Sequence, residues 1–143
     1  MITSADCPLC QPHGENLLWQ DAHTRVVRVD DPAHPGFCRV IWNAHVAEMT
    51  DLAPAQRYHL MQLVFAVETA LRHALQPAKI NLASLGNQVP HLHWHVIARF
   101  ADDATFPDAI WAPPRRAGAT RRIDSAALER AVRDALMALT GGA

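Results

Sequence analysis

Three histidines, His91, His93 and His95, alternate with single apolar residues near the middle of the chain. Successive side chains of a β-strand point to opposite faces, so the three imidazoles would share one face and their apolar neighbours the other. On a helix, each step of two residues would rotate the side chain by about 200°, and the imidazoles would not converge. The spacing therefore predicts that the stretch from Pro90 to Phe100 is extended and displays three imidazoles on one face.

Three kinds of chemistry fit such a face. In the first interpretation the histidines are ordinary polar-face residues, but clustered imidazoles repel when protonated, and groups with a near-neutral pKa concentrate at functional sites. In the second, two or three of them bind one catalytic metal that keeps a position for water, although no acidic residue stands nearby in the strand. In the third, one imidazole attacks phosphorus while its neighbours orient it and handle protons.

The sequence Gly86-Asn87-Gln88-Val89-Pro90, followed by His91-x-His93-x-His95-Val96-Ile97, resembles the signature of the histidine triad (HIT) superfamily of nucleotide hydrolases and transferases. The resemblance covers most of residues 19–111, in the family's order and at about its spacing. It implies an α+β fold, with a five-stranded antiparallel sheet, a long helix and a carboxyl-terminal helix. It also implies a homodimer, in which two chains continue one sheet.

The same resemblance implies a double displacement at a nucleotide α-phosphate. His93 would be the nucleophile and would form a covalent nucleotidyl-histidine that is later hydrolysed. His95 would lie beside the phosphate and stabilise developing negative charge, while His91 would fix the strand and orient its neighbours. A backbone carbonyl that accepts a hydrogen bond from the other ring nitrogen of His93 would select the attacking tautomer.

Five further residues are implied as substrate contacts. Asn81 falls where the family has a polar residue near the phosphate. Asn87 and Gln88 occupy the loop that contacts the α-phosphate and leaving group, where neutral amides fit because a carboxylate would repel the phosphate. Asp30 or Asp31 would accept hydrogen bonds from the ribose hydroxyls.

Phe37 departs from the family pattern. The best-known branches have a fourth histidine facing the site at this position, whereas this chain has Pro35-Gly36-Phe37. A phenyl ring can neither donate to a phosphate nor shuttle a proton, so proton transfer and the leaving-group preference are left open. The loop from Asn81 to His91 is also about one residue shorter than in the purine-specific branch, and base specificity is not carried over.

Cys7 and Cys10 form a C-x-x-C pair, which in a reducing compartment is more often a metal clip than a disulfide. In zinc-bearing relatives such a pair is completed by two histidines, at the positions of His45 and His91. A tetrahedral zinc site would tie the amino terminus to the sheet and lock His91 beside the nucleophile. The alternative is that the two cysteines are incidental.

The elements that must position these residues follow from periodicity and chain breakers. We expect a hairpin arm over residues 19–29, a loop over 30–36, and strands over 37–42, 79–84 and 92–100. Apolar residues at helical spacing predict a core-facing helix of about 20 residues from Pro54 to a point before Pro77. A second helix is expected over residues 124–140, ended by Gly141 and Gly142.

The chain has 143 residues, which predicts a single domain over residues 1–143 with its core at about 15–112. Its formal net charge of −1 disfavours a nucleic acid polymer or an anionic membrane as partner. No apolar run is long enough to span a bilayer, and residues 1–6 are too polar for a signal peptide. Three cysteines, an odd number, argue against a disulfide framework, so we expect the cytoplasm.

The remaining candidates have weaker signals. The resemblance implies that the segment after the triad strand folds over the site, where an arginine can meet a distal phosphate and Trp111 can stack on a base. The ordinary alternatives are that the arginines lie in a solvated loop and that Trp111 covers the apolar core. Cys38 is assigned to core packing. The arginines are Arg115, Arg116, Arg121 and Arg122, and the histidines without an assigned function are His13, His23, His34, His59 and His73.

The resulting hypothesis is a HIT-type enzyme that cleaves a phosphorus bond in a nucleoside phosphoramidate, a dinucleoside polyphosphate or a related conjugate. Its chemistry runs through His93 and requires no cofactor, and a structural zinc is possible. One alternative is a nucleotide-binding sensor or adaptor with weak or no catalysis, for which Phe37 is the reason. A metal-dependent hydrolase is the third.

Overall fold

The computed structural model describes residues 3–141, in which five strands form one antiparallel sheet in the order β1-β2-β3-β5-β4. The α+β fold expected from the sequence is therefore confirmed. The strands are β1 (Asn16–Gln20), β2 (Thr24–Arg28), β3 (Phe37–Trp42), β4 (Lys79–Ala83) and β5 (His93–Arg99). The helices are η1 (Met49–Asp51), α1 (Pro54–Leu75) and α2 (Ser125–Leu139).

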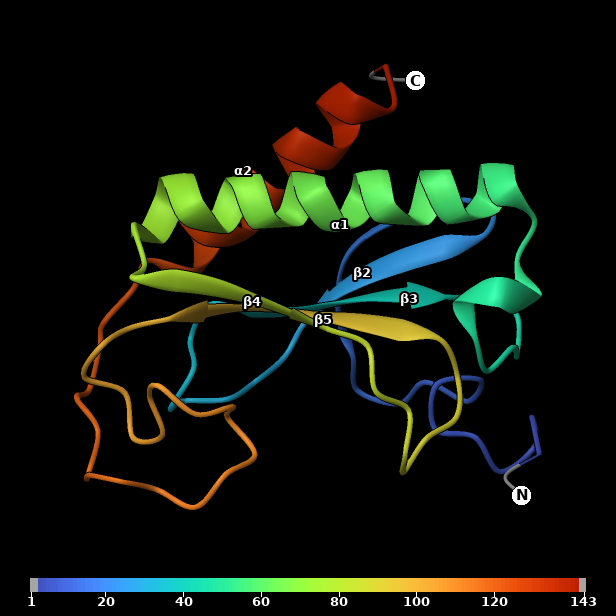
Figure 1. Cartoon of the computed structure of the whole chain (residues 1–143). Coiled ribbons are helices and arrows are strands. Elements are labelled where there is room, and N and C mark those ends of the chain that lie inside the picture. Colours follow the sequence, from blue (N-terminus) through green and yellow to red (C-terminus); the bar gives the residue numbers. More distant parts are fainter. Residues whose placement is uncertain (1–2, 142–143) are drawn as a thin grey trace.

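Both long helices lie on one side of the sheet, and the irregular segments lie on the other (Figure 1). The buried core lies between the sheet and the helices, where Val40 and Val96 pack with Leu63 and Val67 of α1. Burial of this apolar surface is the main stabilising contribution to such a fold. The helix-covered face of the sheet is thus devoted to packing.

The bounds of α1 follow from local chemistry. Pro54 occupies the first turn, where its missing N–H leaves no helical hydrogen bond unmade, and the Gln56 side chain accepts from the Ala53 N–H at 2.8 Å. At the other end Gln76 adopts a left-handed conformation with φ of 49°, and Pro77 follows. The expected helix is confirmed at this position.

Gly36 places β3 close to the end of α1. A Cβ at this position would come within 2.5 Å of the Leu75 Cδ1 and 2.8 Å of the Ala98 Cβ, so only glycine fits. The Pro35-Gly36-Phe37 segment therefore enters the sheet in close contact with the helix, and it delivers Phe37 to the opposite face.

That opposite face, which we call the helix-free face, carries Phe37, Arg39, His93, His95 and Arg99. Cross-strand partners share a face, and Arg39 pairs with His95 while Phe37 pairs with Ile97. The alternation predicted for the histidine strand is present, although β5 begins at His93 and His91 just precedes it. The polar residues of two central strands are thereby gathered on one surface.

Some expected bounds differ slightly. β1 begins three residues before the expected arm, and α2 begins one residue after the expected start. Gly142, the second glycine expected to end α2, lies outside the described residues. Within residues 3–141, no helix is both long enough and apolar enough to cross a membrane.

Candidate active site and metal site

His93 is buried at the start of β5, and its ring is held by one backbone hydrogen bond. Its Nδ1 lies 2.6 Å from the carbonyl oxygen of His91. Because a carbonyl only accepts, Nδ1 carries the proton and Nε2 keeps a free lone pair. Burial lowers the pKa of His93, and the positive charge of Arg39 lowers it further, which favours the neutral ring. The arrangement supplies an imidazole whose Nε2 is ready to act as a nucleophile.

His95 lies beside His93 in a largely apolar environment. Its ring centroid is 4.9 Å from that of His93, 5.0 Å from that of Trp111 and 5.6 Å from that of Phe37. Burial, with the charges of His93 and Arg39, lowers the pKa of His95 to about 4. Its Nδ1 is buried with no hydrogen-bond partner among the described residues. At neutral pH His95 is therefore an uncharged ring that offers one N–H.

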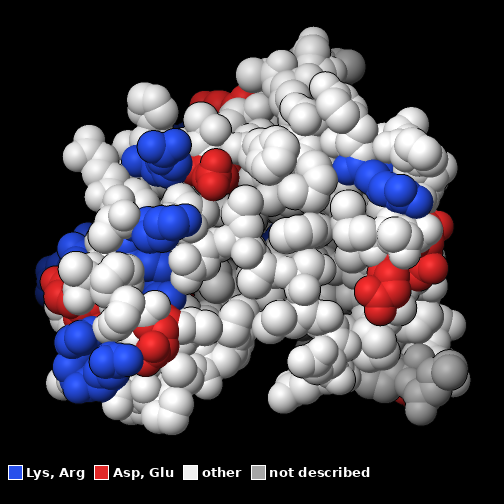
Figure 2. All heavy atoms as spheres, in the orientation of Figure 1, with Lys and Arg blue, Asp and Glu red and all other residues white. Residues whose placement is uncertain are grey.

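A cavity of about 370 Å³ opens in front of the two histidines. Asn87 and Gln88 of the β4–β5 loop line it together with His93 and His95, so the structure brings four of the predicted residues together. Figure 2 shows the surface indented on the side away from the helices, between the β4–β5 loop and the segment after β5. The other lining residues are Pro8, Leu9, Arg39, Leu85, Gly86, Val89 and Trp111.

Asn81 lies on the helix-free face but outside the lining of this cavity. Its side-chain oxygen accepts from the Arg99 Nη1 at 2.8 Å, which leaves its NH₂ group free to donate. Arg99 is 1% exposed and makes two hydrogen bonds to Asp103, at 2.8 and 2.9 Å. These bonds, with the backbone N–H groups of the loop, hold the pKa of Asp103 at about 2 against the effect of burial.

Asp30 and Asp31 lie in the loop after β2 and line a different hollow, which shares no residue with the triad cavity. The Asp31 carboxylate accepts from the Ala33 N–H at 3.0 Å and lies 3.0 Å from the His34 Nδ1. The structure therefore does not bring these two carboxylates to the histidines, and their ribose contact stays a prediction.

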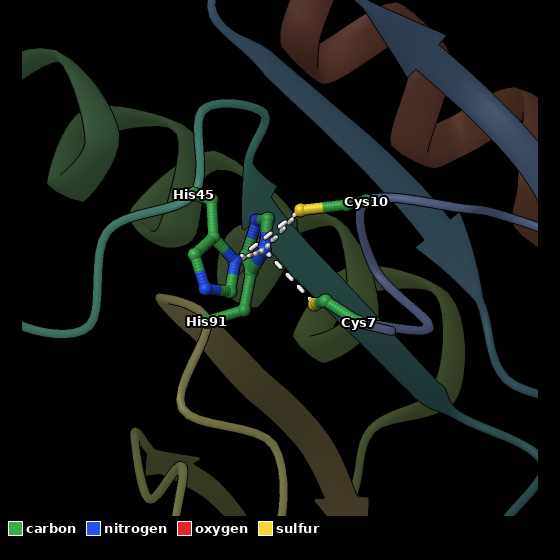
Figure 3. A group of neighbouring side chains, drawn as sticks. All are labelled: Cys7, Cys10, His45 and His91. Atoms are coloured by element: carbon green, nitrogen blue, oxygen red, sulfur yellow. Dashed lines mark hydrogen bonds between the residues drawn. The ribbon is translucent and has the colours of Figure 1, made fainter. Parts of the chain in front are cut away.

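Cys7, Cys10, His45 and His91 converge on one point (Figure 3), with their candidate ligand atoms all within 4.8 Å of one another. The His91 Nδ1 lies 3.4 Å from the Cys7 Sγ, 3.3 Å from the Cys10 Sγ and 3.3 Å from the His45 Nδ1. Tetrahedral zinc, with bonds of about 2.0–2.1 Å to nitrogen and 2.3 Å to sulfur, separates its ligand atoms by about 3.3–3.8 Å. The distances from the His91 Nδ1 to the other three ligand atoms agree with that range.

The His91 ring is oriented for this role by the sheet. Its Nε2 donates to the carbonyl of Trp42, which leaves the Nδ1 lone pair directed at the two sulfurs. Cys7 and His91 are both completely buried. The group includes His91 but neither His93 nor His95, so the metal-capable cluster and the cavity-lining histidines are adjacent and separate.

Three arginines of the segment after β5 bind partners within that segment. Arg115 pairs with the Asp108 carboxylate, Arg116 donates to two backbone carbonyls, and Arg121 pairs with Asp102 and stacks on Phe100. None of these arginines, nor Arg122, lines the triad cavity. Trp111 does line it and is 52% exposed, so it lies at the mouth of the site and outside the core.

Sequence reasoning missed Arg39 and the Arg99–Asp103 pair. A signal for Arg39 exists, because it is a charged residue within the strand Phe37–Trp42 and lies two residues after Phe37, on the same face. No comparable signal marks Arg99 and Asp103, since their pairing depends on the course of the following loop.

A scan against protein families matches residues 13–102 to the HIT domain. The chain belongs to the HIT family. None of the curated proteins matches this HIT chain in a sequence search.

Among solved structures, a histidine triad protein from Bradyrhizobium japonicum is 27% identical, with a TM-score of 0.69 over 82% of this chain and 90% of that chain. One from Sinorhizobium meliloti is 22% identical, with a TM-score of 0.69 over 84% and 88% of the two chains. A Zn-bound HIT family protein from Mycobacterium smegmatis is 19% identical, with a TM-score of 0.63 over 99% and 100%. The fold of this HIT chain is therefore that of its structural neighbours.

Proposed function

We propose that this HIT protein is a nucleotide hydrolase or nucleotidyl transferase that acts on the α-phosphate of its substrate through His93. The observation that carries the proposal is the hydrogen bond from the His93 Nδ1 to the His91 carbonyl, in a cavity large enough for part of a nucleotide. This bond leaves the Nε2 lone pair available, and a neutral imidazole is the form that attacks.

In the proposed reaction, the His93 Nε2 forms a bond to the α-phosphorus while the bond from phosphorus to the leaving group breaks. The leaving group departs with the bonding electron pair. Water, or another acceptor in a transferase, then attacks phosphorus, and the N–P bond breaks to regenerate His93. The neutral His95 ring donates to the phosphate oxygens as negative charge develops, and the amides of Asn87 and Gln88 add donors.

The test is to compare the wild type with His93→Asn on two substrates, an adenosine phosphoramidate and a diadenosine polyphosphate. We expect the substitution to lower turnover at least about 1,000-fold, because removal of a nucleophile leaves only the contribution of binding and electrostatics. His73→Asn, at an exposed position of α1, is the matched control and should retain activity.

A rapid acid quench should trap a nucleotidyl adduct on the wild type and not on His93→Asn. Unchanged turnover in His93→Asn would refute the mechanism. Tight nucleotide binding by the wild type, with neither turnover nor an adduct, would favour the sensor or adaptor alternative, which the phenyl ring of Phe37 keeps open.

We further propose that Cys7, Cys10, His45 and His91 hold a structural zinc. Support comes from the fit of their spacing to a tetrahedral ion and from the Zn-bound protein of Mycobacterium smegmatis that shares the fold. Four protein ligands close the coordination sphere, so the ion would supply rigidity and leave no position for substrate. All three cysteines are unpaired, and a reducing compartment such as the cytoplasm would keep them so.

We also propose a homodimer in which two copies join their sheets. β4 is an edge strand, and an uncovered edge presents unpaired backbone N–H and C=O groups that another strand can satisfy. Light scattering after size-exclusion chromatography should give a mass of about twice the 15.8 kDa of one chain. A mass of one chain at micromolar concentration would contradict the proposal.

A further inference from the structure

Arg39 is the one lysine or arginine among the described residues that line the triad cavity, and no carboxylate lines it. It lies on β3 directly across from His95 and on the same face. It lines the same cavity as His93 and His95. The cavity thus has a fixed cation beside the proposed nucleophile, and it holds no counterion.

The hydrogen-bonding capacity of Arg39 is unused within residues 3–141. A guanidinium carries five N–H donors, yet no described residue accepts a hydrogen bond from Arg39, and its Nε is buried without a partner. Glu15, the acidic residue whose charge acts on it, already makes two hydrogen bonds of 2.9 Å to Arg25. Arg39 is half-buried, and a buried N–H donor without a partner is costly, so this guanidinium is suited to an anionic ligand.

The two buried arginines, Arg25 and Arg99, differ from Arg39 because their donors have acceptors. Arg25 binds Glu15, Asn43 and a backbone carbonyl, and Arg99 binds Asp103, Asn81 and Thr105. Arg39 instead lies near the Phe37 ring, with the guanidinium carbon 5.7 Å from the ring centroid. A guanidinium with free donors matches a phosphate in geometry, because two parallel N–H groups can bind two phosphate oxygens.

We infer that Arg39 forms an anion subsite that binds a second phosphate, joined to the α-phosphate that His93 attacks. The inference rests on the proposed function and specifies its substrate class. A phosphorus–oxygen–phosphorus linkage, as in a dinucleoside polyphosphate, would place this second phosphate in the leaving group. Arg39 is then the residue that favours such conjugates over nucleoside phosphoramidates.

The chemistry of the leaving group supports this preference. When the His93 Nε2 bonds to the α-phosphorus, the bridging P–O bond breaks and its electron pair stays on the departing phosphate. That phosphate leaves as an anion, so it needs a cation and no proton. An amine leaving from a phosphoramidate must gain a proton, and Phe37, on the same face as Arg39, has none to give. Phe37 and Arg39 therefore favour the same class of leaving group.

The first experiment measures kcat/KM for a diadenosine polyphosphate and for an adenosine phosphoramidate in the wild type, Arg39→Gln and Arg39→Lys. We expect Arg39→Gln to lose at least about 10-fold more activity on the polyphosphate than on the phosphoramidate, as expected for hydrogen bonds to a charged group. Arg39→Lys should restore part of that difference. Arg115→Gln, an exposed arginine outside the cavity, is the matched control. Equal losses on the two substrates would overturn the inference.

The second experiment measures binding alone and separates the inference from the proposed function. Calorimetry on His93→Asn should show tighter binding of ADP than of AMP by about 10-fold, and adding Arg39→Gln should bring the ratio near one. A ratio that Arg39→Gln leaves unchanged, or no binding of either nucleotide, would overturn the subsite. If the wild type hydrolyses neither substrate and Arg39→Gln still removes this ratio, the subsite is supported and the hydrolase is refuted.

Discussion

At His93, a single backbone carbonyl decides which ring nitrogen is free. That carbonyl belongs to His91, whose own ring is fixed by the Trp42 carbonyl on one side and by the thiols of Cys7 and Cys10 on the other. The residue that orients the proposed nucleophile is therefore held at both nitrogens of its ring. This arrangement explains how His91 can belong to the metal-capable cluster and still position His93.

Trp111 carries a prediction at the same scale. It is 52% exposed and its ring lies 5.0 Å from that of His95, so its apolar surface faces the cavity mouth rather than the core. Trp111→Ala should weaken nucleotide binding by about 5- to 160-fold, because stacking of a base on an aromatic ring contributes about 1–3 kcal/mol. Calorimetric titration with AMP measures the loss.

The control for Trp111→Ala is Tyr58→Ala on α1, where the side chain is 69% exposed and outside the cavity lining. We expect Tyr58→Ala to leave AMP binding unchanged, and both variants to keep thermal midpoints close to that of the wild type. Wild-type affinity for AMP in Trp111→Ala would show that this ring covers no part of the bound nucleotide.

At the scale of elements, the end of β5 is joined to the segment after it by the buried pair of Arg99 and Asp103. Both side chains are at most 5% exposed, and Asp103 also accepts from the backbone N–H groups of Thr105 and Phe106. Asp103→Asn should lower the free energy of unfolding by about 3 kcal/mol, because it leaves a buried guanidinium without its counterion. Urea denaturation at pH 7 measures this change.

Asp108→Asn provides the matched control in the same segment. Asp108 pairs with Arg115 at the surface, where ion pairs contribute about 0–1 kcal/mol, so we expect a change below about 1 kcal/mol. Equal effects of the two substitutions would mean that burial of the Arg99–Asp103 pair adds nothing to stability.

The Arg99–Asp103 pair should also make the free energy of unfolding depend on pH. The pKa of Asp103 is about 2 in the folded protein and 3.8 as the unperturbed value, so the unfolded state takes up its proton first as the pH falls. The stabilisation is complete above about pH 4 and is lost between about pH 4 and 2. The stability difference between the wild type and Asp103→Asn should therefore shrink in that interval. A difference that stays constant down to pH 2 would contradict this assignment.

The elements were predictable where a local pattern determines them. Alternation located the β5 face, and Pro54 and Pro77 bracketed α1, because these effects act within a few residues. Asn81 and Arg39 show the limit of such patterns. The partner of Asn81 is an arginine on the neighbouring strand, and the isolation of Arg39 depends on Glu15 being bound elsewhere. Partners that come from distant segments leave no periodic signal.

At the scale of the whole molecule, one face of the sheet forms the core and the other forms the cavity. One face packs on α1 and α2, and the other is covered by the amino-terminal segment, the β4–β5 loop and the segment after β5 (Figure 1). All three segments contribute to the triad cavity, through Pro8 and Leu9, Asn87 and Gln88, and Trp111 respectively. The metal-capable cluster lies where the amino-terminal segment meets the sheet, so a zinc ion there would fix one wall of the cavity.

Zinc removal is the corresponding prediction. Protein purified without chelator should carry about one zinc per chain, and stripping the metal should lower the free energy of unfolding by at least about 2 kcal/mol, since a ligand at 100 times its Kd stabilises by about 2.7 kcal/mol. Cys10→Ser should reduce both the zinc content and the stability. Elemental analysis and thermal unfolding, with and without added zinc, measure these effects.

Cys38→Ala separates loss of a metal ligand from loss of a thiol. Cys38 is completely buried in the core, outside the metal cluster, and burial raises the pKa of its thiol to about 12. This variant should keep full zinc occupancy even where its packing is weakened.

Because Pro8 and Leu9 lie between the two cysteine ligands and line the cavity, zinc-free protein should also bind AMP more weakly. Less than about a tenth of a zinc per chain in untreated protein would contradict the proposed site, since structural zinc binds with about 10–16 kcal/mol at neutral pH.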